Sequence, residues 1–111
     1  MAVVKNTEVA ALDLGEGVSR KILASGGGMM TVQFDFAGGS VGYLHTHPHE
    51  QVGYVAAGRF EITLAGEKTI IETGDTYYVP QNVEHGVVAL EEGILLDVFT
   101  PQREDFLKTI E

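Results

Sequence analysis

Cysteine is absent from the 111-residue chain, and basic residues are few. Without cysteine there can be no disulfides, no thiolate metal ligands and no cysteine nucleophile. Seven Lys and Arg residues stand against 16 Asp and Glu residues, which gives a formal net charge of −9. The basic residues are scattered along the sequence, whereas nucleic-acid binding depends on clustered cations that displace counterions. We therefore expect no nucleic-acid partner.

Long apolar segments are also missing. The segment 24–41 has Asp35 as its one charged residue, but it is too polar and too rich in glycine to cross a bilayer. The N-terminus lacks a basic segment followed by an apolar one, so no secretory signal is expected. No linker, repeat or low-complexity tract divides the chain, and its length suits one domain. These features predict a single domain over residues 1–111 that is cytoplasmic and has no membrane partner.

Apolar and polar residues alternate over short segments that are separated by turn residues. Met30–Phe36 and Arg59–Leu64 alternate most clearly, and Ala65–Gly66 joins the second of these to Lys68–Glu72 as a hairpin. Short strands with frequent turns are typical of an antiparallel barrel or sandwich. Further strands are predicted at Arg20–Ala24, Val41–His45, Gln51–Ala57, Thr76–Val79, His85–Leu90 and Ile94–Phe99.

The end of the chain has a different pattern. Thr100 is a suitable N-cap and Pro101 a suitable first-turn residue, which predicts a short C-terminal helix through Asp105, Phe106 and Ile110. The expected fold class is therefore all-β with a short helical tail.

Three of the four histidines lie close together, at positions 45, 47 and 49. His45 and His47 are two residues apart, so on an extended strand both side chains project to the same side. These two imidazoles, an amide oxygen from Gln51 and a further imidazole from His85 would make a four-ligand metal site. The alternative is a solvated histidine run, or a single histidine satisfied in the core. We expect His49 to orient a neighbouring residue or to face solvent.

A second candidate group begins on the segment Ile94–Phe99, which is apolar except at Asp97. A charged residue there is costly to bury unless it is paired or functional. Phe99 shares the face of Asp97, and Arg103 follows four residues later. Beside a metal, the three would supply an acid–base group, an apolar wall and a guanidinium suited to a carboxylate. Taken singly, they could instead be a structural acid bonded to the backbone or to Arg103, a core aromatic residue and a solvated helix residue.

The candidate metal ligands lie within two spaced motifs. The first, over residues 39–58, is Gly39–x5–His45–x–His47–x3–Gln51–x6–Gly58, and the second, over residues 74–89, is Gly74–x5–Pro80–x–Asn82–x2–His85–x3–Ala89. Both motifs resemble those of the cupin superfamily. The segment between them is as short as in small single-domain cupins. Gln51, Asn82 and Ala89 stand where the family usually has Glu, Gly and Asn. The resemblance implies a single-domain jelly-roll barrel, or antiparallel double-stranded β-helix, of roughly six to eight strands with a divalent metal inside.

Gln51 is the departure from the family pattern with the largest chemical consequence. A Glu would cancel one unit of metal charge, whereas an amide donates a neutral oxygen, so a site of three histidines and one glutamine favours Lewis-acid chemistry. Gln51 could also lie outside the ligand set, which would leave a three-histidine site. Nickel, zinc, iron, manganese and cobalt all suit these ligands. We therefore expect one divalent transition metal per chain, of unspecified identity.

The chain contains the segment His45–x–His47–Pro48–His49–Glu50–Gln51 and, later, His85 and Asp97–x–Phe99–x3–Arg103. This combination resembles the KdgF family of pectin degradation proteins. These small cupins open the ring of 4,5-unsaturated monouronates released by pectate or alginate lyases. The resemblance implies a metal-dependent, isomerase-type enzyme that yields linear keto-deoxyuronates. In that reaction Asp97 would move the proton, Arg103 would hold the carboxylate and Phe99 would hold the ring. Two other functions stay open: a three-histidine iron dioxygenase, and a non-catalytic sugar-binding or sensor domain.

Apolar residues near the N-terminus predict an assembly. Val3–Val4 and Val9–Leu14 present more apolar surface than a small barrel can cover by itself. We therefore expect a homodimer.

Overall fold

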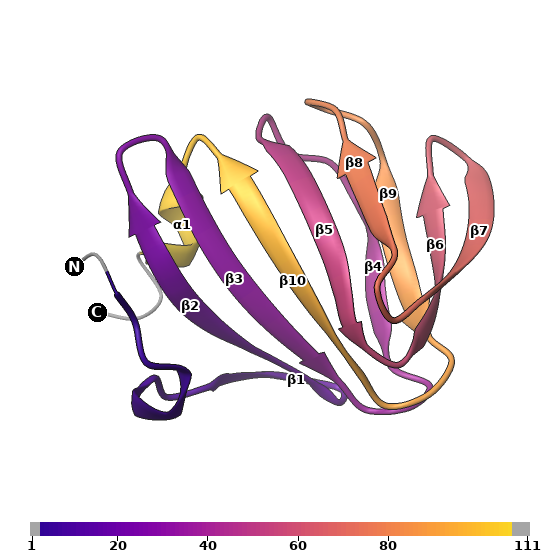
Figure 1. The fold of residues 1–111 in the computed structure, drawn as a ribbon. Helices are drawn as coiled ribbons and strands as arrows, with labels where there is room; N and C mark the ends of the chain where they lie inside the picture. The colour runs from indigo at the N-terminus through magenta and orange to yellow at the C-terminus, as the bar shows by residue number, and fades with distance from the viewer. Residues whose placement is uncertain (1–2, 108–111) are drawn as a thin grey trace.

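Ten strands form two antiparallel sheets in the computed structural model, which describes residues 3–107 (Figure 1). The larger sheet has the order β1-β2-β3-β10-β5-β8, and the smaller has the order β4-β9-β6-β7. A 3₁₀ turn at Asn6–Glu8 precedes β1, and the helix α1 (Glu104–Leu107) follows β10. The strands are β1 (Leu12–Gly15), β2 (Val18–Gly26), β3 (Met29–Phe36), β4 (Val41–His45), β5 (Glu50–Ala57), β6 (Arg59–Leu64), β7 (Glu67–Glu72), β8 (Thr76–Val79), β9 (His85–Ala89) and β10 (Gly93–Thr100).

The core lies between the two sheets, because alternate residues of each strand point inward. Phe36 of β3 and Phe60 of β6 meet edge to face with ring centroids 5.3 Å apart, so side chains from both sheets fill one interior. A second buried group consists of Met30, Val32 and Phe99, and Phe106 of α1 packs against it. The predicted all-β fold of antiparallel strands is therefore confirmed.

The predicted strands are all present, with ends that differ by a few residues. Ala65 and Gly66 have φ angles of 51° and 82° and form the turn between β6 and β7, as the hairpin prediction requires. Residues 3–107 form ten strands, more than the family resemblance implied. Strand β1 was not predicted, because its four residues are mostly exposed and too few to show an alternating pattern.

The predicted start of the C-terminal helix is wrong. Thr100 is the last residue of β10, where it still pairs with Glu50 of β5, so it cannot act as an N-cap. The helix begins at Glu104 instead, and the amides of Phe106 and Leu107 donate to the carbonyl of Arg103. The predicted end at Ile110 lies outside the described residues.

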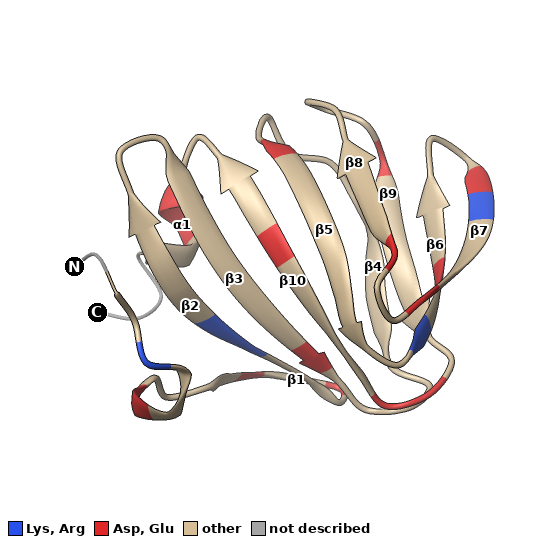
Figure 2. Ribbon diagram, viewed as in Figure 1, with Lys and Arg blue, Asp and Glu red and all other residues tan. Residues whose placement is uncertain are grey.

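Charged side chains are distributed unevenly over the strands (Figure 2). Acidic residues occur mostly at strand ends and turns, but one lies in the middle of β10, whose single acidic residue is Asp97. Within residues 3–107 we find no helix with the length and apolar character that crossing a bilayer requires.

Candidate metal centre and active site

The side chains of His45, His47 and His85 converge from two strands and a connecting segment. His45 ends β4 and His85 begins β9, and the two residues are direct partners in the antiparallel ladder. His47 lies after the end of β4. The alternation of side chains along a strand, which was the predicted reason for its side chain to lie near that of His45, therefore does not apply. The carbonyl of His47 instead accepts a hydrogen bond from the amide of Asn82 at 2.8 Å. That bond ties the first motif to the second.

All three imidazoles are oriented through Nδ1, which donates to a backbone carbonyl. The bonds run from His45 to Tyr43 (2.7 Å), from His47 to His49 (3.0 Å) and from His85 to Val83 (2.9 Å). Because a carbonyl can only accept, Nδ1 carries a proton in each ring, which leaves Nε2 as the atom with the lone pair in a neutral ring. Metal-binding histidines are commonly fixed in this way. The candidate ligand atoms of the three residues lie within 4.8 Å of one another.

The backbone carbonyl of His49 orients His47. The ring of His49 is half-buried and does not belong to the group of three histidines.

The buried histidines are held in the neutral form that binds metals. Burial lowers the pKa of His85 from 6.5 to about 4. Burial, followed by the charge of Arg103, lowers the pKa of His47. Within residues 3–107, His85 Nε2 is buried and has no hydrogen-bond partner. A buried polar atom without a partner is costly, and a metal ion would satisfy this one.

The amide of Gln51 contacts the same centre. Its Oε1 lies 3.1 Å from Nε2 of His47, although both atoms present lone pairs when His47 is protonated on Nδ1. Such a contact is repulsive unless the amide is flipped or a cation lies beside both atoms. Four donors, from His45, His47, Gln51 and His85, therefore fit a divalent metal.

Asp97 lies inside the larger sheet at the centre of β10 and is only 4% exposed. Its Oδ1 accepts a hydrogen bond of 2.6 Å from the hydroxyl of Tyr77. Burial raises the pKa of Asp97 to about 6, and hydrogen bonds from Tyr77 and Gln51 partly oppose that rise. Burial and the Asp97 carboxylate raise the pKa of Tyr77 well above its usual value, so the phenol remains a donor. A carboxyl group with a pKa near 6 is suited to accepting and returning a proton at neutral pH.

Phe99 shares the inner face with Asp97, as predicted, and its ring lies 5.6 Å from that of His47 in an edge contact.

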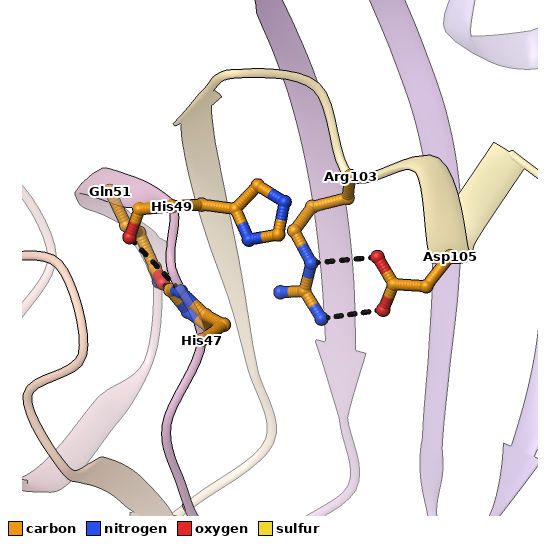
Figure 3. Close-up of polar contacts among 5 residues, drawn as sticks. All are labelled: His47, His49, Gln51, Arg103 and Asp105. Carbon is orange, nitrogen blue, oxygen red and sulfur yellow. Dashed lines mark hydrogen bonds and ion pairs between the residues drawn. The ribbon is translucent and has the colours of Figure 1, made fainter.

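Arg103 is 9% exposed, and its guanidinium lies 5.1 Å from the ring centre of Phe99. The alternative of a solvated Arg103 therefore does not hold. Asp105 accepts two hydrogen bonds from Arg103, from Nε at 3.0 Å and from Nη2 at 2.8 Å. The remaining terminal nitrogen points toward His47 and His49 (Figure 3).

A cavity of about 320 Å³ joins these groups. Six of the seven predicted site residues line it, namely His45, Gln51, His85, Asp97, Phe99 and Arg103. Arg20 and Phe34 also line it, although the first 38 residues contributed nothing to the predicted site. Tyr77 and Asp105 were missed as well. Tyr77 carries no motif, and alternation along β8 was the one available sign that it points inward.

Comparisons with known proteins agree with the motifs. The Cupin domain family matches residues 32–99, which include both motifs. The pectin degradation protein KdgF of Dickeya dadantii (strain 3937) is 50% identical over 97 residues, which cover 86% of this chain and 88% of that protein. Among solved structures, KdgF from Halomonas sp. has a TM-score of 0.91 and 39% identity, with 96% of this chain and 98% of that chain covered.

A second structure is equally similar in shape. An RmlC-like cupin from Shewanella frigidimarina NCIMB 400 has a TM-score of 0.91 and 38% identity, with 94% of each chain covered. The similarity in sequence and the similarity in structure thus both extend over most of the chain. The chain belongs to the cupin superfamily and, within it, to the KdgF family.

Proposed function

We propose that the protein linearises 4,5-unsaturated monouronates from pectin or alginate breakdown to linear keto-deoxyuronates. The observation that carries this proposal is a buried carboxyl group with a pKa of about 6 in a cavity that is also lined by His45 and His85, two members of a three-histidine cluster. Acid–base chemistry beside an electrophilic centre suits a reaction that moves one proton and opens one ring. The similarity to proteins named for pectin degradation supports the substrate class.

His45, His47, Gln51 and His85 are the proposed ligands of one divalent transition metal. When bound, the metal would act as a Lewis acid toward oxygen atoms of the substrate, and neutral ligands would leave it its full positive charge. The observations that support this ligand set are the fixed Nδ1 atoms and the close contact between Gln51 and His47.

The proposed reaction needs no change in oxidation state. Asp97 accepts the proton of the C1 hydroxyl group as the C1–O5 bond breaks, and the electron pair of that bond goes to O5. The products of this step are an aldehyde at C1 and an enolate at C5. Asp97 then returns the proton to C4, which gives an α-keto acid. The proton that leaves oxygen ends on carbon, so the reaction is an isomerisation.

Phe99 and Arg103 are proposed to hold the substrate. Phe99 supplies an apolar wall for the ring, and the positive charge of Arg103 attracts the carboxylate. Asp105 already occupies one edge of the guanidinium, so the substrate carboxylate would meet the remaining terminal nitrogen. This proposal is supported by the direction of that nitrogen, toward His47 and His49 (Figure 3).

The test is to add the purified protein to an unsaturated monouronate generated by a lyase. Absorbance of the conjugated double bond should fall in air and equally under anaerobic conditions. It should stop falling after metal removal and resume on metal addition. A strict requirement for oxygen would favour the dioxygenase alternative, and a bound but unconverted uronate would favour the binding-domain alternative. Full activity of a metal-free protein would contradict the proposed site.

Replacing two of the histidines tests the ligand set. His85→Ala should lose the metal, because Nε2 of His85 is a proposed ligand, whereas His49→Ala should largely keep it. Elemental analysis should find about one divalent ion per chain in the wild type, as a four-ligand site requires. Metal retained at the wild-type level by His85→Ala would overturn this assignment.

We also propose a homodimer. Val3 is 76% exposed and Leu14 is 44% exposed, so the N-terminal segment leaves apolar surface in water. The outer face of the larger sheet adds Val52, Tyr54 and Tyr78, which are all exposed. Apolar surface of this kind is commonly covered by a partner.

A further inference from the structure

Four residues form a row across the inner face of the larger sheet. Tyr77 of β8 pairs with Gly53 of β5, Gly53 pairs with Asp97 of β10, and Asp97 pairs with Val32 of β3. Partners in neighbouring strands point to the same side of a sheet. Tyr77 and Asp97 are therefore two strands apart, with only a glycine between them.

The glycine leaves the space through which the two side chains meet. A Cβ atom at position 53 would lie 2.0–2.4 Å from three atoms of the Tyr77 side chain, including the hydroxyl oxygen. The phenol thus lies directly over the backbone of Gly53. From there its hydroxyl reaches Oδ1 of Asp97 at 2.6 Å. Any larger residue at position 53 would have to displace the ring.

We propose that Tyr77 is a positioning residue, which holds Asp97 through Oδ1, and that Gly53 is required so that Tyr77 can do so. This inference rests on the proposed function for its effect on rate, but the contact itself is independent of that function. A carboxylate with one oxygen fixed has a single orientation, and proton transfer depends strongly on orientation.

A purely structural role for Tyr77 makes different predictions. An aromatic ring over a glycine also shields the backbone and adds packing, and such packing needs the ring but not the hydroxyl. Tyr77→Phe keeps the ring and removes the hydroxyl, so it separates the two roles. Tyr78→Phe is the matched control, because Tyr78 is the next residue of β8, is 50% exposed and bonds to Glu50 on the outer face.

The experiment measures kcat and KM for the unsaturated monouronate on metal-loaded protein. Tyr77→Phe should lower kcat about 10- to 100-fold, as expected for one hydrogen bond to a charged group, and KM should stay within about twofold. Metal content should remain at the wild-type level. Tyr78→Phe should match the wild type. A wild-type kcat in Tyr77→Phe would overturn the proposal.

A double-mutant cycle tests whether Tyr77 acts through Asp97. In an Asp97→Asn background, Tyr77→Phe should cause no further loss of kcat, because the group that it positions is already inactive. Gly53→Ala should reproduce the loss of kcat with the metal retained. If the loss of kcat in the double variant equals the product of the two single losses, Tyr77 acts independently of Asp97. That result would overturn the proposal.

A second measurement applies if the wild-type protein does not convert the uronate. The same cycle is then measured in urea unfolding of the metal-loaded protein, with circular dichroism to confirm that each variant folds. Coupling between Tyr77→Phe and Asp97→Asn supports the positioning contact even though the proposed substrate is wrong. Additive effects on the unfolding midpoint would overturn the contact itself.

Discussion

The carboxyl group of Asp97 is deeply buried, and no basic residue stands next to it in the sequence. Its pKa is raised from 3.8 to about 6 by burial. The ionised form therefore destabilises the folded state once the pH rises through about 6, and a neutral replacement avoids that cost. A charged residue that lowers the stability of the fold but is kept within an apolar strand is typical of a functional group.

Asp97→Asn should therefore separate activity from stability. We expect kcat to fall by about 10²–10⁴, the usual contribution of a general acid–base group. At pH 7 the melting temperature should be at or above that of the wild type, because the amide is neutral. Calorimetry and turnover measured on the same sample provide the check. Reduced stability with normal turnover per folded molecule would identify a structural acid instead.

The pKa of His85 predicts a pH dependence for the metal-free protein. Its folded-state pKa of about 4 lies below the ordinary 6.5, so below pH 6.5 the unfolded chain binds a proton that the folded chain does not. Stability should fall as the pH drops from about 6.5 toward 4. Asp97 acts in the opposite direction below about pH 6. The measurement is therefore the difference in urea midpoint between chelator-treated wild type and His85→Gln across this range. A difference that does not change with pH would contradict the prediction.

Where a motif specified a residue, the sequence named residues that the structure brings together, and it missed residues that only a partner strand brings to the site. His45, His47, Gln51 and His85 lie at fixed spacings within two motifs, and an acid within an apolar strand identified Asp97. Tyr77 reaches Asp97 because β8 pairs with β5 and β5 pairs with β10. That order depends on the whole sheet, and no local pattern in β8 encodes it.

At the scale of elements, the short segment that ends in α1 brings Arg103 to the cavity. Phe106 lies with its ring centre 4.0 Å from the guanidinium of Arg103, and Asp105 holds the same group by two hydrogen bonds. Alternation predicted the strands well, because it records which face of each segment is buried. The helix start was mispredicted because pairing of Thr100 with Glu50 extends β10 beyond its apolar part.

Replacing Arg103 should affect binding more than chemistry. Arg103→Ala should raise KM at least tenfold with a smaller change in kcat, since attraction of the carboxylate acts in both the ground state and the transition state. Asp105→Asn should give a smaller rise in KM, because it weakens only the orientation of the guanidinium. Arg59→Ala is the control, since Arg59 pairs with Glu72 on an exposed part of the surface. An unchanged KM in Arg103→Ala would exclude this role.

For the whole molecule, exposed apolar side chains predict the assembly state. Light scattering at micromolar concentration should give a mass of about 24 kDa, twice the 12.0 kDa of one chain. Val52→Glu distinguishes the two candidate faces: it should reduce the mass only if the outer face of the larger sheet forms the interface. A wild-type mass of 12.0 kDa would exclude the dimer.

The proposed metal ligands have one further consequence, because they come from both sheets. His45 and His85 belong to the smaller sheet, whereas Gln51 belongs to the larger one. An ion held by all of them would be a removable cross-link between two layers that are otherwise joined by side-chain packing and chain connections. Ligand binding to the native state alone stabilises it by mass action. Metal supply would then set how long each molecule survives heat and proteolysis as well as how fast it works.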